Sequence, residues 1–93
     1  MPEQKRIHVV VRGIVQGVFY RSSAQEKAQD LNLTGWVRNL QNGDVELEAQ
    51  GSQEQLDSLL LWAQQGPSSA RVESVLCNAC DIRNDEQDFL VLR

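Results

Sequence analysis

Apolar and polar residues alternate along several short stretches of this chain. In the first, Ile7, Val9 and Val11 occupy every second position, which is the period of a strand with one covered face. A later alternation around Leu47 places acidic residues on the other face, and Asn42-Gly43 just before it is typical of a tight hairpin turn. We therefore expect five strands, at residues 6–12, 36–40, 44–49, around 72–76 and at 89–92.

Between the first two predicted strands, the apolar spacing changes from two residues to three or four. The segment 24–31 keeps this spacing, which predicts a helix with one apolar face. Ser22 or Ser23 can cap this helix, and Ser23 with Glu26 fits a capping box. We expect the helix to end near Asn32.

A second helix is predicted after the third strand. Ser52 with Gln55 fits another capping box, leucines follow at helical spacing over residues 56–60, and Gly66-Pro67 ends the pattern. The order of elements is then β-α-β-β-α-β, which is the ferredoxin-like arrangement of the α+β class. We expect two helices on one face of an antiparallel sheet of four to five strands, and a single domain over residues 1–93.

Composition narrows the classes of partner. The formal net charge of −4 and the sequence pI of about 4.8 argue against nucleic acid as a partner, since binding the phosphate backbone needs a basic face. No apolar run reaches the ~20 residues of a membrane span, and the N-terminus lacks the pattern of a signal peptide. We expect a monomer in the cytoplasm, with no membrane partner.

The two cysteines, Cys77 and Cys80, have the spacing of a Cys-x-x-Cys pair. A redox pair of this kind stands at the start of a helix, whereas this one follows an apolar, strand-like run. No second pair is present to complete a zinc site. We interpret the two residues as incidental thiols at a strand end.

A glycine-bearing turn lies between the first strand and the first helix and contains the candidate chemistry. It includes Gly13 and Gly17 and ends at Arg21. Glycines allow positive φ and a close approach of ligand to backbone, and the N–H groups at a helix start can bind an anion. An arginine at that point adds a permanently charged, planar donor for phosphate oxygens.

Two segments of the chain resemble the signatures of the acylphosphatase family. The first ends in Val-Gln-Gly-Val-Phe-Tyr-Arg at residues 15–21, and departs from the family only at Tyr20, where Phe or Met is usual. The second is Gly-Trp-Val-Arg-Asn at residues 35–39, followed at the family's spacing by Gly43, Val45 and Gly51. The resemblance extends from about residue 7 to the C-terminus.

The resemblance implies a reaction and a set of site residues. The reaction is hydrolysis of an acyl phosphate to a carboxylate and inorganic phosphate, without a cofactor, a metal ion or a covalent nucleophile. Arg21 would hold the phosphoryl oxygens and Asn39 would position the attacking water. The backbone amides of the loop would form the rest of the phosphate cradle, at Gln16, Gly17, Val18, Phe19 and Tyr20.

Other polar residues have simpler interpretations. We interpret His8 as a structural strand residue. Arg12 and Arg38 could add positive potential near the site or could be surface charges only. The alternation of the third strand predicts a solvated face rather than a cation site for its three acidic residues, Asp44, Glu46 and Glu48.

Two other functions are compatible with this fold. The first is a module that binds a phosphate ligand without turning it over; similar domains occur as modules inside larger enzymes that use carbamoyl phosphate. RNA-recognition modules share the topology but expose aromatic residues on their central strands. Residues 7–11 of the first strand contain no aromatic residue, which disfavours the RNA interpretation.

Overall fold

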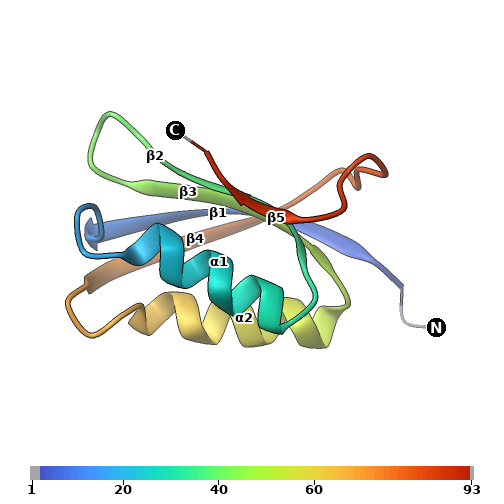
Figure 1. Cartoon of the computed structure of the whole chain (residues 1–93), viewed down its shortest axis with the longest axis horizontal. Coiled ribbons are helices and arrows are strands. Elements are labelled where there is room, and N and C mark those ends of the chain that lie inside the picture. Colours follow the sequence, from blue (N-terminus) through green and yellow to red (C-terminus); the bar gives the residue numbers. More distant parts are fainter. Residues whose placement is uncertain (1–2, 93) are drawn as a thin grey trace.

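Two helices cover one face of a five-stranded sheet in the part of the chain that the structure, a computed structural model, describes: residues 3–92 (Figure 1). The elements are β1 (Lys5–Ile14), α1 (Tyr20–Asp30), β2 (Thr34–Asn39), β3 (Val45–Gly51), α2 (Gln53–Gln65), β4 (Arg71–Cys80) and β5 (Phe89–Val91). The strand order is β4-β1-β3-β2-β5. The predicted ferredoxin-like α+β fold is confirmed.

The sheet is mixed rather than antiparallel throughout. β1 pairs antiparallel with β3 and β4, and β2 pairs antiparallel with β3. β5 instead runs parallel to β2, with Gly35 opposite Phe89 and Val37 opposite Val91. The chain leaves β4 at one edge of the sheet and returns at the opposite edge (Figure 1), so β5 enters beside β2 in the same direction. The end of β5 therefore lies next to the end of β2.

The core lies between the sheet and the two helices. Val9 and Val11 of β1, with Leu47 of β3, are fully buried on the face that the helices cover. The helices contribute small residues from α1 and leucines from α2, namely Ala24, Ala28, Leu56 and Leu59. This packing fixes where α1 starts relative to the ends of the strands.

The opposite face of the sheet is held by ion pairs between neighbouring strands. The Arg6 side chain is fully buried and bonds the carboxylates of Glu48, at 2.6 Å, and Glu86, at 2.6 Å. The Glu86 contact fastens the segment before β5 to β1, because a buried arginine must keep its carboxylate partners. The acidic face of β3, which was expected to be solvated, is therefore largely engaged in ion pairs.

The same correction applies to the other acidic residues of that strand region. Asp44 pairs with Arg12 at 3.3 Å, and Glu46 pairs with both Arg38 and His8, at 2.6 and 2.7 Å. These contacts support the structural interpretation of His8. They also place Arg12 and Arg38 in ion pairs on the face away from the helices.

The cysteines occupy opposite faces of β4. Cys77 lies opposite Val9 in the register, so it points to the helix side, whereas Cys80 lies opposite Arg6 on the other side. Both are free thiols. Residues three apart on a strand point away from each other, and a disulfide needs Cβ atoms within roughly 4.5 Å. The pair cannot close a disulfide within this strand.

Among the described residues, neither helix is long and apolar enough to cross a membrane.

Candidate active site

Three connections meet at one end of the molecule: β1 to α1, β2 to β3, and α2 to β4 (Figure 1). The Gln16 side chain ties the first two together, because its amide nitrogen donates to the carbonyls of Leu40, at 2.7 Å, and Asp44, at 2.8 Å. The Ser69 hydroxyl joins the third by donating to the Val18 carbonyl at 3.1 Å. The β1–α1 loop is therefore held from both sides.

The first helix begins in an unusual way for a helix. Its N-cap is Phe19, with φ 65° and ψ 21°, and no side chain caps the helix. Gly17 also has a positive φ, of 73°, with open space where a Cβ would lie. Helix N-terminal N–H groups need partners from outside the helix, and within residues 3–92 the amides of 17–22 have no acceptor. These amides form an uncapped helix end, which is an arrangement that can bind an anion.

This start differs from the predicted one. Helix α1 begins at Tyr20, two to three residues before the expected serines, and the capping box of Ser23 with Glu26 does not form. The Ser22 hydroxyl instead donates to the Phe19 carbonyl at 3.2 Å. A phenylalanine rarely adopts the left-handed region, so local sequence preferences predict that the helix starts later, at the serines. The earlier start brings Arg21 into the first turn.

Arg21 reaches from the first turn of α1 toward the end of β5. Its Nη1 donates to the Leu92 carbonyl at 3.3 Å. Leu92 is in turn hydrogen-bonded through its N–H to Val37 of β2, at 2.8 Å. A guanidinium has five N–H donors, so this contact leaves most of them for a ligand. The parallel pairing of β5 with β2 therefore places Arg21 beside the strand that ends at Asn39.

Asn39 ends β2 and carries an unsatisfied polar atom. Its Oδ1 is buried and has no hydrogen-bond partner among the described residues. Leaving a buried acceptor unpaired costs about 1–3 kcal/mol, and such atoms in native structures call for an explanation. A water or ligand in the adjacent pocket would satisfy this oxygen.

Arg21 and Asn39 line one pocket, of about 270 Å³, with the loop and the end of β5. The complete lining is Val15, Gly17, Phe19, Tyr20, Arg21, Ser22, Asn39 and Val91. Arg21 is the charged residue of this lining, which contains no carboxylate within the described part of the chain. An anion is therefore attracted here even though the protein is acidic overall.

Most of the predicted site residues line this pocket. Two of the seven, Gln16 and Val18, do not: the Gln16 side chain is committed to the β2–β3 connection. Sequence reasoning missed Val15, Ser22 and Val91. Val91 could not be found without knowing that β5 pairs with β2, whereas Ser22 follows directly after the signature.

Tyr20, the departure from the usual family residue, anchors the loop in the core. Its hydroxyl donates to the Ala63 carbonyl of α2 at 2.8 Å, and its ring packs on Trp62 with centroids 5.1 Å apart. Burial raises the pKa of the phenol, which keeps it protonated as a donor. Gly66 makes room for the ring, because a Cβ there would lie 2.7 Å from it. The extra hydroxyl therefore has the partner that a buried phenol needs.

Residues 3–92 contain no group of three or more His, Cys, Asp or Glu side chains arranged to hold a metal ion.

An α+β fold with an uncapped helix start, an arginine and a buried amide in one pocket fits the class of small proteins that bind phosphate groups. The acylphosphatase family model matches residues 7–91. An acylphosphatase of Methylococcus capsulatus is 51% identical over 89 residues, which cover 96% of this chain and 97% of the relative. The chain therefore belongs to the acylphosphatase family, and it is an enzyme of that class.

Solved structures agree with this assignment. An acylphosphatase from Coxiella burnetii superposes with a TM-score of 0.91 at 45% identity, covering 96% of this chain and 93% of the other. An acylphosphatase from Bacillus subtilis gives the same TM-score at 27% identity, covering 96% and 99%.

Proposed function

We propose that the pocket hydrolyses acyl phosphates by in-line attack of a water molecule on phosphorus, with Arg21 and the loop amides holding the phosphoryl group and Asn39 orienting the water. The observation that carries the proposal is that Asn39, whose buried Oδ1 has no hydrogen-bond partner among the described residues, lines the same pocket as Arg21. One group can order a water and the other can bind an anion.

The phosphoryl group would occupy the uncapped start of α1. The amides of residues 17–21 offer donors, the helix dipole favours a negative charge, and Arg21 adds planar donors that match phosphate oxygens. Of the predicted cradle residues, Gly17, Phe19 and Tyr20 line the pocket. The Gln16 side chain instead holds the loop against the β2–β3 connection, so we assign it a positioning role.

The attacking water would donate a hydrogen bond to Asn39 Oδ1. A carboxamide is not a base, so Asn39 contributes orientation rather than proton removal. The new bond joins the water oxygen to phosphorus, and the bond from phosphorus to the acyl oxygen breaks. The products are a carboxylate and dihydrogen phosphate. The carboxylate is a stable leaving anion, which explains how positioning and charge stabilisation suffice.

We propose that the reaction needs no metal ion or cofactor, because Arg21 and the amides supply positive charge where a metal would. On the sequence arguments given above, we also propose that the chain acts as a single domain and a monomer in the cytoplasm, with acyl phosphate and inorganic phosphate as its small-molecule partners. Light scattering of the purified protein tests the oligomeric state.

The test is hydrolysis of benzoyl phosphate, with EDTA present, by the wild type and by the variants Arg21→Ala and Asn39→Ala. We expect kcat/KM to fall at least about 10³-fold for the arginine variant and roughly 10²- to 10³-fold for the asparagine variant. Arg38→Ala is the matched control, since Arg38 precedes Asn39 but points to the other face of the sheet, where it pairs with Glu46.

Three results would contradict the proposal. A folded wild type without activity would leave phosphate binding without turnover, which titration with inorganic phosphate would then measure. Full activity in Arg21→Ala would remove the assigned role of the arginine. Loss of activity on adding EDTA, restored by a divalent metal, would refute metal independence.

A further inference from the structure

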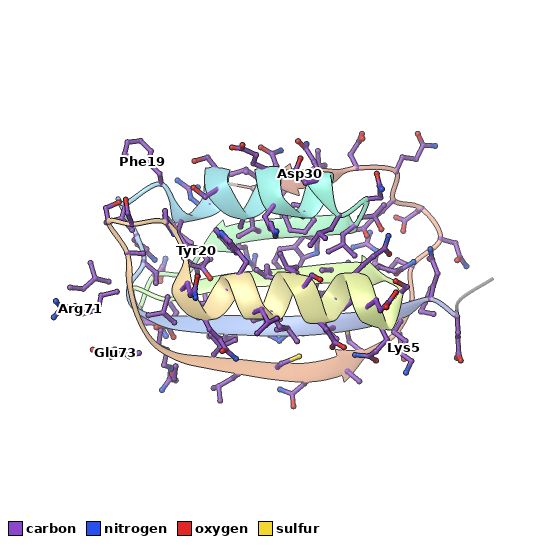
Figure 2. The ribbon with its side chains drawn as sticks, turned by 90° about the horizontal axis from the view of Figure 1, so that it is seen from below. Lys5, Phe19, Tyr20, Asp30, Arg71 and Glu73 are labelled. Carbon is purple, nitrogen blue, oxygen red and sulfur yellow. The ribbon has the colours of Figure 1, made fainter. Side chains whose placement is uncertain are left out.

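Phe19 combines features that a folding sequence ordinarily avoids. The residue is 78% exposed, its backbone is in the left-handed region at φ 65°, and it stands at the N-cap of α1 without a side-chain cap. In Figure 2 the labelled Phe19 ring projects away from the ribbon at the start of α1. Strained residues of this kind persist where the surrounding structure holds them, and they gather at functional sites.

The neighbours of Phe19 hold it in this conformation. Tyr20, the next residue, is buried and bonded to Ala63, while Val18, the residue before, accepts a hydrogen bond from Ser69. The Phe19 carbonyl accepts from the Ser23 amide at 3.0 Å and from the Ser22 hydroxyl. With the backbone fixed on both sides, the ring is kept outside the core rather than left there by a flexible loop.

The exposed Phe19 belongs to the candidate active-site pocket. Phe19 lines the same cavity as Arg21 and Asn39, together with the apolar residues Val15 and Val91. The cavity therefore has a polar part that suits the phosphoryl group and an apolar part that the phosphoryl group does not use. The acyl substituent is the remaining portion of the substrate, and the apolar part suits a hydrophobic one.

We infer that Phe19 is a specificity-determining residue that contacts the acyl group and favours acyl phosphates with an aromatic or otherwise apolar acyl group over acetyl phosphate. This inference rests on the proposed function. An aromatic ring offers a flat, rigid apolar surface at low cost in conformational entropy, and it prefers offset or edge contacts with another ring. A methyl group has too little surface to use it.

The test compares benzoyl phosphate with acetyl phosphate on the wild type, Phe19→Asn and Phe19→Gly. Asparagine and glycine both tolerate the left-handed conformation, so the loop keeps its shape while the ring is removed. Leu61→Asn is the matched control: Leu61 is a similarly exposed apolar residue, at 68%, on α2 and outside the pocket. The intrinsic reactivities of the two substrates cancel when each variant is compared with the wild type.

We expect kcat/KM for benzoyl phosphate to fall about tenfold more than kcat/KM for acetyl phosphate in both Phe19 variants. Such a change corresponds to about 1.4 kcal/mol of selectivity. The Leu61 control should keep the wild-type ratio, and Phe19→Tyr, which retains a ring, should keep most of it.

An unchanged ratio in both Phe19 variants would overturn the inference, and so would an equal loss for both substrates, which would mean that Phe19 only shapes the loop. A wild type that hydrolyses neither substrate would refute the proposed function itself. The two failures are therefore distinguishable.

Discussion

The two helices of this protein begin in opposite ways. Helix α2 starts at Ser52, whose hydroxyl accepts from the Gln55 amide at 3.3 Å while the Gln55 side chain accepts from the Ser52 amide at 2.9 Å. Glu54 adds a negative charge to its first turn. Helix α1 has Phe19 as its N-cap, with no side-chain cap and no acid in its first turn, and Arg21 places a cation there, which opposes the helix dipole.

This difference shows where local stability and function conflict. The start of α2 satisfies two of its N–H groups with its own side chains and therefore offers fewer donors to a ligand. The start of α1 leaves its amides open, and it is held by contacts from outside the helix, at Tyr20 and Ser69. A substrate anion would satisfy those amides and compensate the charge of Arg21.

The first prediction concerns the contacts that hold the start of α1. Tyr20→Ala should lower the free energy of unfolding by about 3–5 kcal/mol, because it deletes a buried aromatic side chain and its hydrogen bond to Ala63. Urea unfolding followed by tryptophan fluorescence measures this. Tyr20→Phe, the control, should cost only about 1 kcal/mol for the lost hydroxyl. A loss below about 1 kcal/mol in Tyr20→Ala would mean that other contacts, such as that of Ser69 with Val18, hold this end.

The second prediction concerns a substitution that gives the first turn of α1 an acidic residue, as Glu54 gives the first turn of α2. Ser22 lines the pocket, and Ser22→Asp places a carboxylate there. Repulsion between like charges a few ångströms apart is worth about 3–4 kcal/mol at the effective dielectric near a protein surface, so we expect kcat/KM to fall at least about 100-fold and phosphate to bind more weakly.

The same substitution should increase stability by about 0.3–1 kcal/mol, because an acid suits a helix N-terminus. Ser22→Asn has nearly the same shape without the charge and serves as the control for activity. Equal activity of the Asp and Asn variants would show that no anion binds near this turn.

The third prediction concerns the capped helix. Ser52→Ala removes the cap of α2 and should lower the free energy of unfolding by about 1 kcal/mol, without changing kcat/KM. Thermal unfolding and a benzoyl phosphate assay measure the two quantities. A loss of activity that exceeds the loss of folded protein would show that the two helix ends are coupled.

The fourth prediction extends the comparison to the face of the sheet away from the helices, where arginines have carboxylate partners. Partial burial opposes the charge of Glu46, but hydrogen bonds from His8 and Arg38 outweigh it and hold the pKa of Glu46 below its ordinary value of 4.5. Because the folded pKa is the lower one, the stabilisation is complete above about pH 4.5 and is lost as the pH falls through the folded pKa.

The measurement for this pair is the unfolding free energy of the wild type and Glu46→Gln as a function of pH. The wild type should be more stable by at most about 1 kcal/mol at neutral pH, and the difference should shrink on acidification below pH 4.5. A difference that grows as the pH falls would reverse the sign of the argument.

The fold could be predicted because its signals are local. Alternation around Leu47 and the capping box of Ser52 with Gln55 placed β3 and α2 almost to the residue. The parallel direction of β5 could not be predicted, because the three residues of this strand carry no pattern that specifies its partner strand or its direction. It depends on the route of the chain across the sheet, which the buried Arg6 pair with Glu86 helps to fasten.

The site was predicted from motifs, and its errors have a physical cause. Local capping rules favour Ser22 or Ser23 as the start of α1, whereas the structure uses Phe19 because tertiary contacts support a strained residue there. Likewise the acidic residues of β3 alternate like those of a solvated face, and only the folded sheet shows that Glu48 pairs with Arg6, and Glu46 with His8 and Arg38, on adjacent strands. The residue pattern of one strand does not predict which residues it will contact on the neighbouring strands.

The contact between Arg21 and Leu92 has a consequence for the order of folding. It joins residues 71 positions apart. The lining of the pocket is complete only after β5, which contributes Val91, has paired with β2. Contacts of such high sequence separation form late, because the entropy of closing a long loop must be paid before they contribute. Catalytic activity in a refolding experiment should therefore return after the helices and the local β2–β3 hairpin have formed, and turnover would report the pairing of β5 with β2.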